Sequence, residues 1–121
     1  MATTKAETHV GHRYNYALNW TADGTITLKL PDKPIRGISW CSDGVDGTGT
    51  LTWNVSCDGV QFNTLGVNTS TDPANPTTVT SATAAGNWSV HEHDVAYPYL
   101  QFVLSSSTNP ALNVTVSVLC F

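Results

Sequence analysis

The chain has 121 residues, of which 12% are charged, and its formal net charge is −4 at pH 7. This length suits one domain that buries its own core without a disulfide or metal staple. Phosphate binding needs clustered Lys and Arg, and this chain has five such residues, scattered, so we expect no nucleic-acid partner. No stretch reaches the roughly 20 apolar residues of a membrane span, so we expect no membrane partner.

The first residues show no two-residue period. We therefore expect residues 1–12 to form an extended N-terminal arm and residues 13–121 to form the folded domain. The same segment lacks the apolar core of a signal peptide, so we expect synthesis in a cytoplasm.

Alternation of apolar and polar residues then predicts strands at 13–20, 25–30 and 35–41. Between the first two, Ala22-Asp23-Gly24 reads as a turn that joins them in a hairpin. Pro31 and Pro34 end the hairpin, because proline cannot donate to a strand ladder. A glycine-rich loop follows at 42–49.

Residues 50–65, TLTWNVSCDGVQFNTL, read as a second hairpin. Leu51, Trp53 and Val55 alternate with polar residues, which predicts one apolar strand face. Asp58-Gly59 predicts a tight primed turn, and Val60, Phe62 and Leu65 are expected to begin the return strand.

The remaining chain continues the same rhythm. The polar segment 66–75 is expected to be a surface loop, and strands are expected at 77–83, 88–93, 97–104 and 112–120. No helix of three turns can be drawn without crossing glycine, proline or a β-branched run. We therefore expect an all-β chain: a single antiparallel β-sandwich or jelly-roll-like domain of eight or nine strands.

Three cysteines, Cys41, Cys57 and Cys120, lie within or at the end of apolar strand patterns. Their spacing is unlike that of a zinc site, and their number is odd. We expect buried free thiols, because cysteine commonly behaves as a small hydrophobe.

The densest ionisable cluster is VHEHDV at 90–95. His91 and His93 share one strand face and are weak candidates for metal ligands; the pair resembles part of a cupin metal site. The glutamate, the glycine and the second histidine motif of that site are missing, so solvated or interface histidines are favoured, and we expect no metal and no other cofactor.

Other residues that could do chemistry are in settings typical of turns and strand faces. Asp43, Asp46 and Asp58 each precede a glycine, where aspartate forms turns, and the full calcium-loop pattern is absent. No serine has the flanking glycines of a nucleophile elbow, and most carboxylates lie in loops. The chain is expected not to be an enzyme.

Aromatic side chains on a sheet can stack on sugar rings. Trp20, Trp40 and Trp53 share the apolar phase of their strands and are expected in the core. In contrast, Trp88, Tyr97 and Tyr99 are candidates for a subunit interface or for sugar stacking.

The segments GTLTWNVSCDGVQFNTL, TSATAAGNW and AYPYLQFVLSSSTNPALNVTVSV together resemble small β-sandwich decoration, or cement, proteins of tailed bacteriophage capsids. The resemblance covers about residues 48–120. The positions that carry it are Ser56, Asp58, Gly59, Phe62, Tyr99, Phe102 and Val103.

This resemblance implies a structural virion protein, commonly a homotrimer, on the outer surface of the capsid. It would bind the major capsid protein and stabilise contacts between capsid subunits. We expect the N-terminal arm to lie on another chain, with Lys5, His9, His12 and Arg13 as the contacting residues. Two alternatives remain: a carbohydrate-binding or adhesin module of a phage tail or cell surface, and a metal-dependent cupin-like enzyme.

Overall fold

The computed structural model describes residues 3–43, 49–65, 67–69, 78–79, 81–82, 86–91, 97–106 and 111–120. These residues form twelve strands and no helix, and every strand pairing is antiparallel. The predicted all-β class and the sandwich of two sheets are confirmed. The predicted count of eight or nine strands is too low, mainly because an extra N-terminal strand and several strands of two or three residues were not expected.

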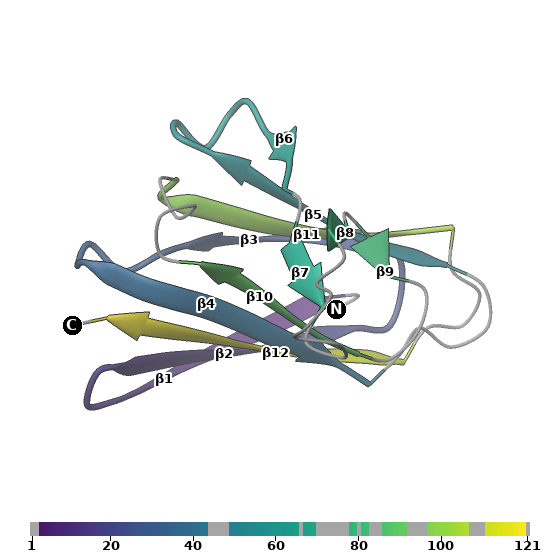
Figure 1. Cartoon of the computed structure of the whole chain (residues 1–121). Coiled ribbons are helices and arrows are strands. Elements are labelled where there is room, and N and C mark those ends of the chain that lie inside the picture. The colour runs from purple at the N-terminus through teal and green to yellow at the C-terminus, as the bar shows by residue number, and fades with distance from the viewer. Residues whose placement is uncertain are drawn as a thin grey trace.

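A seven-stranded sheet forms one layer, in the order β1-β2-β12-β4-β10-β7-β8. Its strands are β1 (Thr3–Val10), β2 (Arg13–Trp20), β12 (Leu112–Cys120), β4 (Ile35–Ser42), β10 (Gly86–His91), β7 (Val67–Thr69) and β8 (Thr78–Val79). The other layer is a five-stranded sheet in which β9 also pairs with β5 (Figure 1). Its strands are β3 (Gly24–Lys29), β11 (Tyr99–Ser105), β5 (Thr50–Ser56), β6 (Asn63–Thr64) and β9 (Ser81–Ala82).

The core lies between the two sheets because the apolar phase of each strand points inward. On β12, buried and exposed or half-buried residues alternate along the whole strand. Trp40 on β4 contacts two rings of the opposite sheet edge-on, Trp53 at 5.3 Å and Phe102 at 5.2 Å between ring centroids. Trp20, Trp40 and Trp53 are all buried, as predicted.

The predicted hairpin of residues 13–30 is wrong in its pairing, although both strands exist. β2 belongs to the seven-stranded sheet, whereas β3 pairs with β11 in the other sheet. The Trp20 indole donates a hydrogen bond to the carbonyl of Gly24 at 3.0 Å. This bond holds the bend by which the chain passes from one layer to the other.

The predicted extended arm is also wrong for residues 3–10. These residues form β1, which pairs with β2 over its whole length, from Thr3 opposite Trp20 to Val10 opposite Arg13. Gly11 and His12 make the two-residue turn; Gly11 has a φ of 59° and His12 is not in the positive-φ region, as in a type II′ hairpin. The N-terminal segment is thus the border strand of the chain's own sheet (Figure 1).

The second predicted hairpin is correct in its first strand and wrong in its turn. Gly59 has a φ of 78°, but Asp58 does not have the positive φ that the expected turn requires. The Ser56 hydroxyl oxygen accepts the N–H of Gly59 at 2.9 Å, and the Asp58 carboxylate accepts the N–H groups of Val60 and Gln61. This network stabilises a wider loop, so the return strand is only Asn63–Thr64.

All three cysteines are free thiols, as predicted, but only Cys120 is buried. Cys41 and Cys57 are exposed, so the prediction of burial is wrong for both. Cys41 occupies the outward phase of β4, next to the buried Trp40. Across the described part of the chain, no helix has the length and apolar character needed to cross a membrane.

Candidate interaction surfaces

The four N-terminal residues predicted to contact a partner are spread over different parts of the β1–β2 hairpin. Lys5 donates to the carbonyl of Thr27 on β3 at 3.0 Å. His9 stacks on Tyr14 with ring centroids 4.0 Å apart, and His12 uses its carbonyl to accept the N–H of Cys120. On the opposite side of the sheet, Arg13 donates to the Ser117 hydroxyl at 2.6 Å. The structure therefore does not gather these four side chains into one site.

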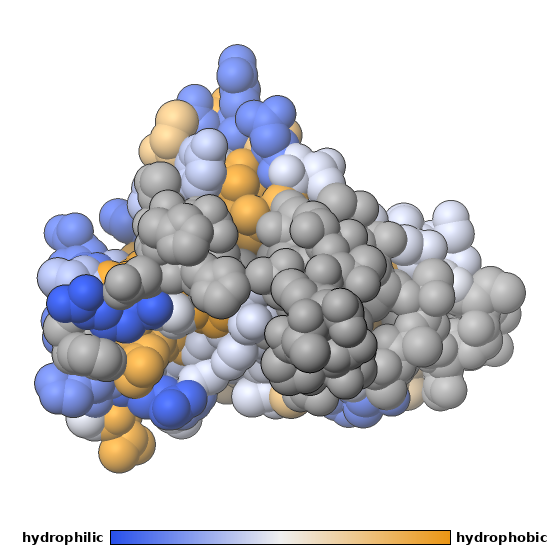
Figure 2. Space-filling model, in the orientation of Figure 1, coloured by the Kyte–Doolittle hydropathy of each residue, from blue (hydrophilic) through white to orange (hydrophobic). Residues whose placement is uncertain are grey.

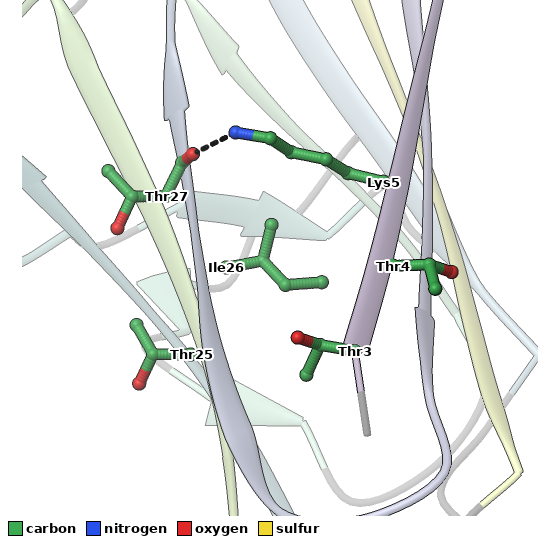
Figure 3. Close-up of a pocket in the computed structure, with 6 residues that line it drawn as sticks. All are labelled: Thr3, Thr4, Lys5, Thr25, Ile26 and Thr27. Atoms are coloured by element: carbon green, nitrogen blue, oxygen red, sulfur yellow. Dashed lines mark hydrogen bonds between the residues drawn. The ribbon is translucent and has the colours of Figure 1, made fainter. Parts of the chain in front are cut away.

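A groove lies where β1 meets β3, the border strand of the other sheet. We call it the β1–β3 groove; its volume is about 420 Å³ and its lining residues are Thr3, Thr4, Lys5, Thr25, Ile26 and Thr27. Figure 3 shows Ile26 pointing from β3 toward β1, and Lys5 reaching across from β1 to β3. The groove was not predicted from the sequence, because neither β1 nor the pairing of β3 with β11 was expected.

Two contacts fix the distance between the strands that form the groove. One is the hydrogen bond from Lys5. The other is the packing of Thr3 on Gly24: a Cβ atom at Gly24 would lie 2.9 Å from the Thr3 Cγ2 atom, closer than such atoms approach. A side chain at Gly24 would therefore displace Thr3 at the N-terminal end of β1.

A second hollow of about 270 Å³ continues the groove along the same two strands. Its lining residues are Lys5, Ala6, Glu7, Tyr16, Leu28 and Lys29. Burial of the Tyr16 phenol, with the charge of Glu7 opposite it on β1, raises the pKa of Tyr16 to about 12. The phenol of Tyr16 therefore stays neutral at ordinary pH and adds no negative charge to this second hollow.

The side of the seven-stranded sheet that faces away from the core forms a broad, nearly uncharged surface, which we call the outer face. Its described residues on the three central strands are Arg13, Asn15, Ala17, Asn19, Gly37, Ser39, Cys41, Asn113, Thr115, Ser117 and Leu119. Arg13 carries the charge in this set, and its guanidinium is held by Ser117. A shallow hollow of about 230 Å³ lies there, beside Ser39 and Ser117.

Few large apolar side chains are exposed on the described surface. In Figure 2, hydrophobic colour appears in separate areas among hydrophilic and weakly polar ones. The large apolar or aromatic residues that are exposed are Val10, Val60 and Tyr97. They belong to three different segments of the chain: β1, the loop after β5 and the residues before β11.

The three aromatic residues proposed for an interface or for sugar stacking have different settings in the structure. Tyr97 is 42% exposed. Tyr99 is half-buried and covers Gly59 so closely that a Cβ atom there would lie 3.1 Å from its ring. Trp88 lies opposite Trp40 in the pairing of β10 with β4, and its side chain is outside the described residues. Of the two tyrosines, Tyr97 is the one whose ring is open to solvent.

The candidate metal ligands give no site in the described structure. His91 ends β10 opposite Gly37, its side chain is not described, and His93 and Asp46 lie outside the described residues. Among the residues that are described, no group of three or more His, Cys, Asp or Glu could hold a metal ion.

The other two aspartates serve structure in different ways: Asp58 stabilises a local turn, as predicted, whereas Asp43 makes a long-range contact that the turn interpretation did not predict. The carboxylate of Asp43 accepts both the backbone N–H and the side-chain amide of Asn113, each at 2.9 Å. This joins the end of β4 to the beginning of β12. The N–H groups of Gln61 and Val60, followed by the Ser56 hydroxyl, lower the pKa of Asp58 below its usual value.

Comparison with known proteins gives a likeness of fold. No protein-family model matches the sequence, and no curated protein matches it. One solved structure that resembles it is the crystal structure of the SPBc2 prophage-derived protein YomS. The TM-score is 0.66 and the sequence identity is 13%, over 96% of this chain and 92% of that one. The two chains share a fold over almost their whole lengths.

Proposed function

We propose that this chain is a structural protein of a bacteriophage particle that decorates the outer surface of the capsid. The observation that carries the proposal is the shared fold with a prophage-derived protein over nearly the whole of both chains. The decoration role rests in addition on the resemblance of residues 48–120 to cement proteins. In this role the chain is made in the host cytoplasm, binds the major capsid protein and carries out no catalysis.

We assign the capsid contact to the outer face in place of an N-terminal arm. A surface of Ser, Thr, Asn and Ala forms hydrogen bonds with a partner while few charges lose their water, which keeps the desolvation cost low. Of the four residues first expected to contact a partner, Arg13 belongs to this face. A contact through Lys5, His9 or His12, and a homotrimer on the capsid, stay predictions.

The proposed effect on the particle is one of mass action. A protein that binds the assembled capsid lattice and not its free subunits stabilises the lattice by about 4 kcal/mol when its free concentration is about a thousandfold above Kd. Weak contacts are therefore sufficient, provided that the chain is abundant during assembly.

The test begins with particles made by a phage genome that encodes the chain. The chain should be present in purified particles in fixed proportion to the major capsid protein. Particles from a genome that lacks the gene should release DNA at a lower temperature, and purified chain added to them should restore the wild-type release temperature. Absence of the chain from purified particles would contradict the proposal.

Two matched variants test the assignment to the outer face. Ser39→Glu with Thr115→Glu adds two carboxylates to exposed positions of that face, whereas Thr25→Glu with Val60→Glu adds the same charge at exposed positions elsewhere. The first variant should fold and fail to bind the particles, and the second should fold and bind. Equal binding of both would show that the capsid contact lies on another surface.

A further inference from the structure

The border strand β1 has a backbone ready to pair with another strand. β1 stands first in the order of the seven-stranded sheet, so one of its edges has no neighbour among the described strands. The two-residue turn at Gly11-His12 makes Val10 and Arg13 a hydrogen-bonded pair, and such pairs alternate along an antiparallel ladder. The backbone groups of Thr3, Lys5, Glu7 and His9 therefore point away from β2, toward the free edge.

The side chains of these same four residues lie on the core side of the sheet. Their partners on β2 are Trp20, Leu18, Tyr16 and Tyr14, all of which are buried. Lys5 and Glu7 are thus opposite charges, two residues apart, on one face of a free edge. A charge at such a position deters most strands from pairing, because they would leave it without a counter-charge. A strand that supplies the counter-charge in register escapes this penalty.

We propose that a second copy of this chain pairs with β1, antiparallel and edge to edge across a two-fold axis. The register places Lys5 of each copy opposite Glu7 of the other, so two pairs of opposite charges form at once. The backbone phase agrees, because both residues of each pair point their N–H and C=O groups toward the free edge. The inference goes beyond the proposed function and does not depend on it.

The charges select this register over its neighbours. A shift by two residues in one direction places Lys5 opposite Lys5, and a shift in the other direction places Glu7 opposite Glu7. Both arrangements put like charges directly across the strand pair, which is destabilising. A shift by one residue pairs outward-pointing backbone groups with inward-pointing ones and moves the side chains to the wrong face.

The uncharged residues of β1 also fit the same register. Ala6 lies opposite Ala6 at the two-fold axis. The two residues form a non-hydrogen-bonded pair, in which the Cα atoms approach closely and a small side chain is suitable. On the outer face, Thr4 lies opposite Thr8, a pair that favours antiparallel strands. In the isolated chain the side chains from Thr4 to Val10 are all exposed, so pairing requires no side chain to leave the core.

The existing contact of Lys5 is compatible with the pair. Its ammonium group has three donors, of which the bond to the Thr27 carbonyl uses one. The resulting assembly has one continuous sheet made from both seven-stranded sheets. Because opposite residues share a face, the two five-stranded sheets lie on the same side of it, with the β1–β3 grooves of both copies next to the two-fold axis.

A charge-reversal experiment tests the pairing in the full chain. Analytical ultracentrifugation should show a concentration-dependent dimer of the wild type. Lys5→Glu and Glu7→Lys should each weaken it, by on the order of 10- to 100-fold in Kd, because each turns two attractive pairs into two repulsive ones. An equimolar mixture of the two variants should form a heterodimer, and the double variant should regain the homodimer.

The double variant separates charge pairing from the loss of the Lys5 contact with Thr27, because that contact is missing from it as well. Circular dichroism of each variant checks that it is folded. A wild-type chain that stays monomeric at about 1 mM, where even a contact of about 4 kcal/mol is populated, overturns the proposal. A trimer that is insensitive to both substitutions overturns it too.

Cross-linking tests the register, in a background in which the exposed thiols are removed by Cys41→Ser and Cys57→Ser. Ala6→Cys should form an inter-chain disulfide, because the Cα atoms at the axis are about 4.5 Å apart, within disulfide range. The control Thr8→Cys should not cross-link with itself, but a mixture of Thr4→Cys and Thr8→Cys chains should cross-link. Cross-linking of Thr8→Cys alone overturns the register.

Particle binding distinguishes self-pairing from pairing with another protein. If Lys5→Glu and Glu7→Lys abolish particle binding and leave self-association unchanged, the strand that pairs with β1 belongs to a virion protein and the proposal fails.

Discussion

Replacement of Gly59 by alanine tests how the Ser56–Gln61 loop is fixed, because two separate penalties meet at this residue. Its φ of 78° lies in the region that residues with a side chain rarely adopt. Its position is also covered by the ring of Tyr99, which a new Cβ atom would approach to 3.1 Å. We therefore expect Gly59→Ala to be among the more destabilising alanine substitutions outside the core.

The expected magnitude follows from these penalties. The unfavourable φ costs about 1–3 kcal/mol. Displacement of a packed ring adds about 1–3 kcal/mol. The stiffer unfolded chain returns about 0.4–1 kcal/mol. The free energy of unfolding should thus fall by about 1–6 kcal/mol.

A double-mutant cycle with Tyr99→Ala isolates the contribution of the ring. In the Tyr99→Ala background the Cβ atom meets no ring, so the cost of Gly59→Ala should fall by the contribution of the ring, about 1–3 kcal/mol. It should then match the cost of Gly11→Ala, because at Gly11 φ is 59° and nothing lies within 4 Å. Urea unfolding of the four variants, and of Gly11→Ala, measures the differences at unchanged slope. Equal costs of Gly59→Ala in both backgrounds would refute the role assigned to Tyr99.

Three further predictions concern single side chains. Hydrogen bonds lower the pKa of Asp58, so its contribution to stability is present above the unfolded value of 3.8 and is lost as pH falls. In urea unfolding, Asp58→Asn should therefore lose less stability than the wild type between pH 7 and pH 3. Burial and the charge of Glu7 raise the pKa of Tyr16 from 10.0 to about 12, so the wild type should lose stability as pH rises from about 10. In an ultraviolet titration, the variant Tyr16→Phe should lack the tyrosine that ionises last in the wild type. In urea unfolding, Trp20→Phe should cost about 1 kcal/mol more than Trp40→Phe. The indole of Trp20 donates a hydrogen bond, whereas that of Trp40 is buried with no acceptor among the described residues. Equal costs of the two substitutions would contradict this interpretation.

The strands with one buried face could be predicted from the sequence. The expected strands 13–20 and 112–120 match β2 and β12 in both their bounds, because each places apolar residues on alternate positions against the core. The partner of each strand could not be predicted. β2 lies next to β12 at the other end of the chain, and no local pattern specifies a pairing over such a separation.

β1 was missed because a border strand that extends past the core does not need an apolar face. Lys5, Glu7 and His9 occupy the inward phase of β1, so the hydrophobic period by which strands are recognised is absent. One local signal was present in the sequence: Gly11-His12, directly before the alternating residues 13–20, suits a two-residue type II′ turn. Recognition of this turn would have replaced the predicted arm with a hairpin.

The candidate surfaces were less accessible to sequence reasoning than the strands were. The outer face exists because the outward residues of β2, β12 and β4 are mostly small and, apart from Arg13, uncharged, which becomes visible once the order of these strands is known. Asp58-Gly59 was correctly recognised as turn chemistry, but the hydroxyl of Ser56 takes part in the network and widens the loop. The sequence pattern indicates a turn at this place without specifying its length.

The exposed thiol of Cys41 can report whether the outer face is covered by a partner. Cys41 stands near the middle of the outer face, whereas the equally free thiol of Cys57 follows β5 in the opposite layer. Alkylation rates of these two thiols, compared in the free chain and in the proposed complex with the capsid, therefore report separately on the two sides of the molecule. A selective slowing at Cys41 identifies the side that becomes shielded, with no substitution introduced into the protein.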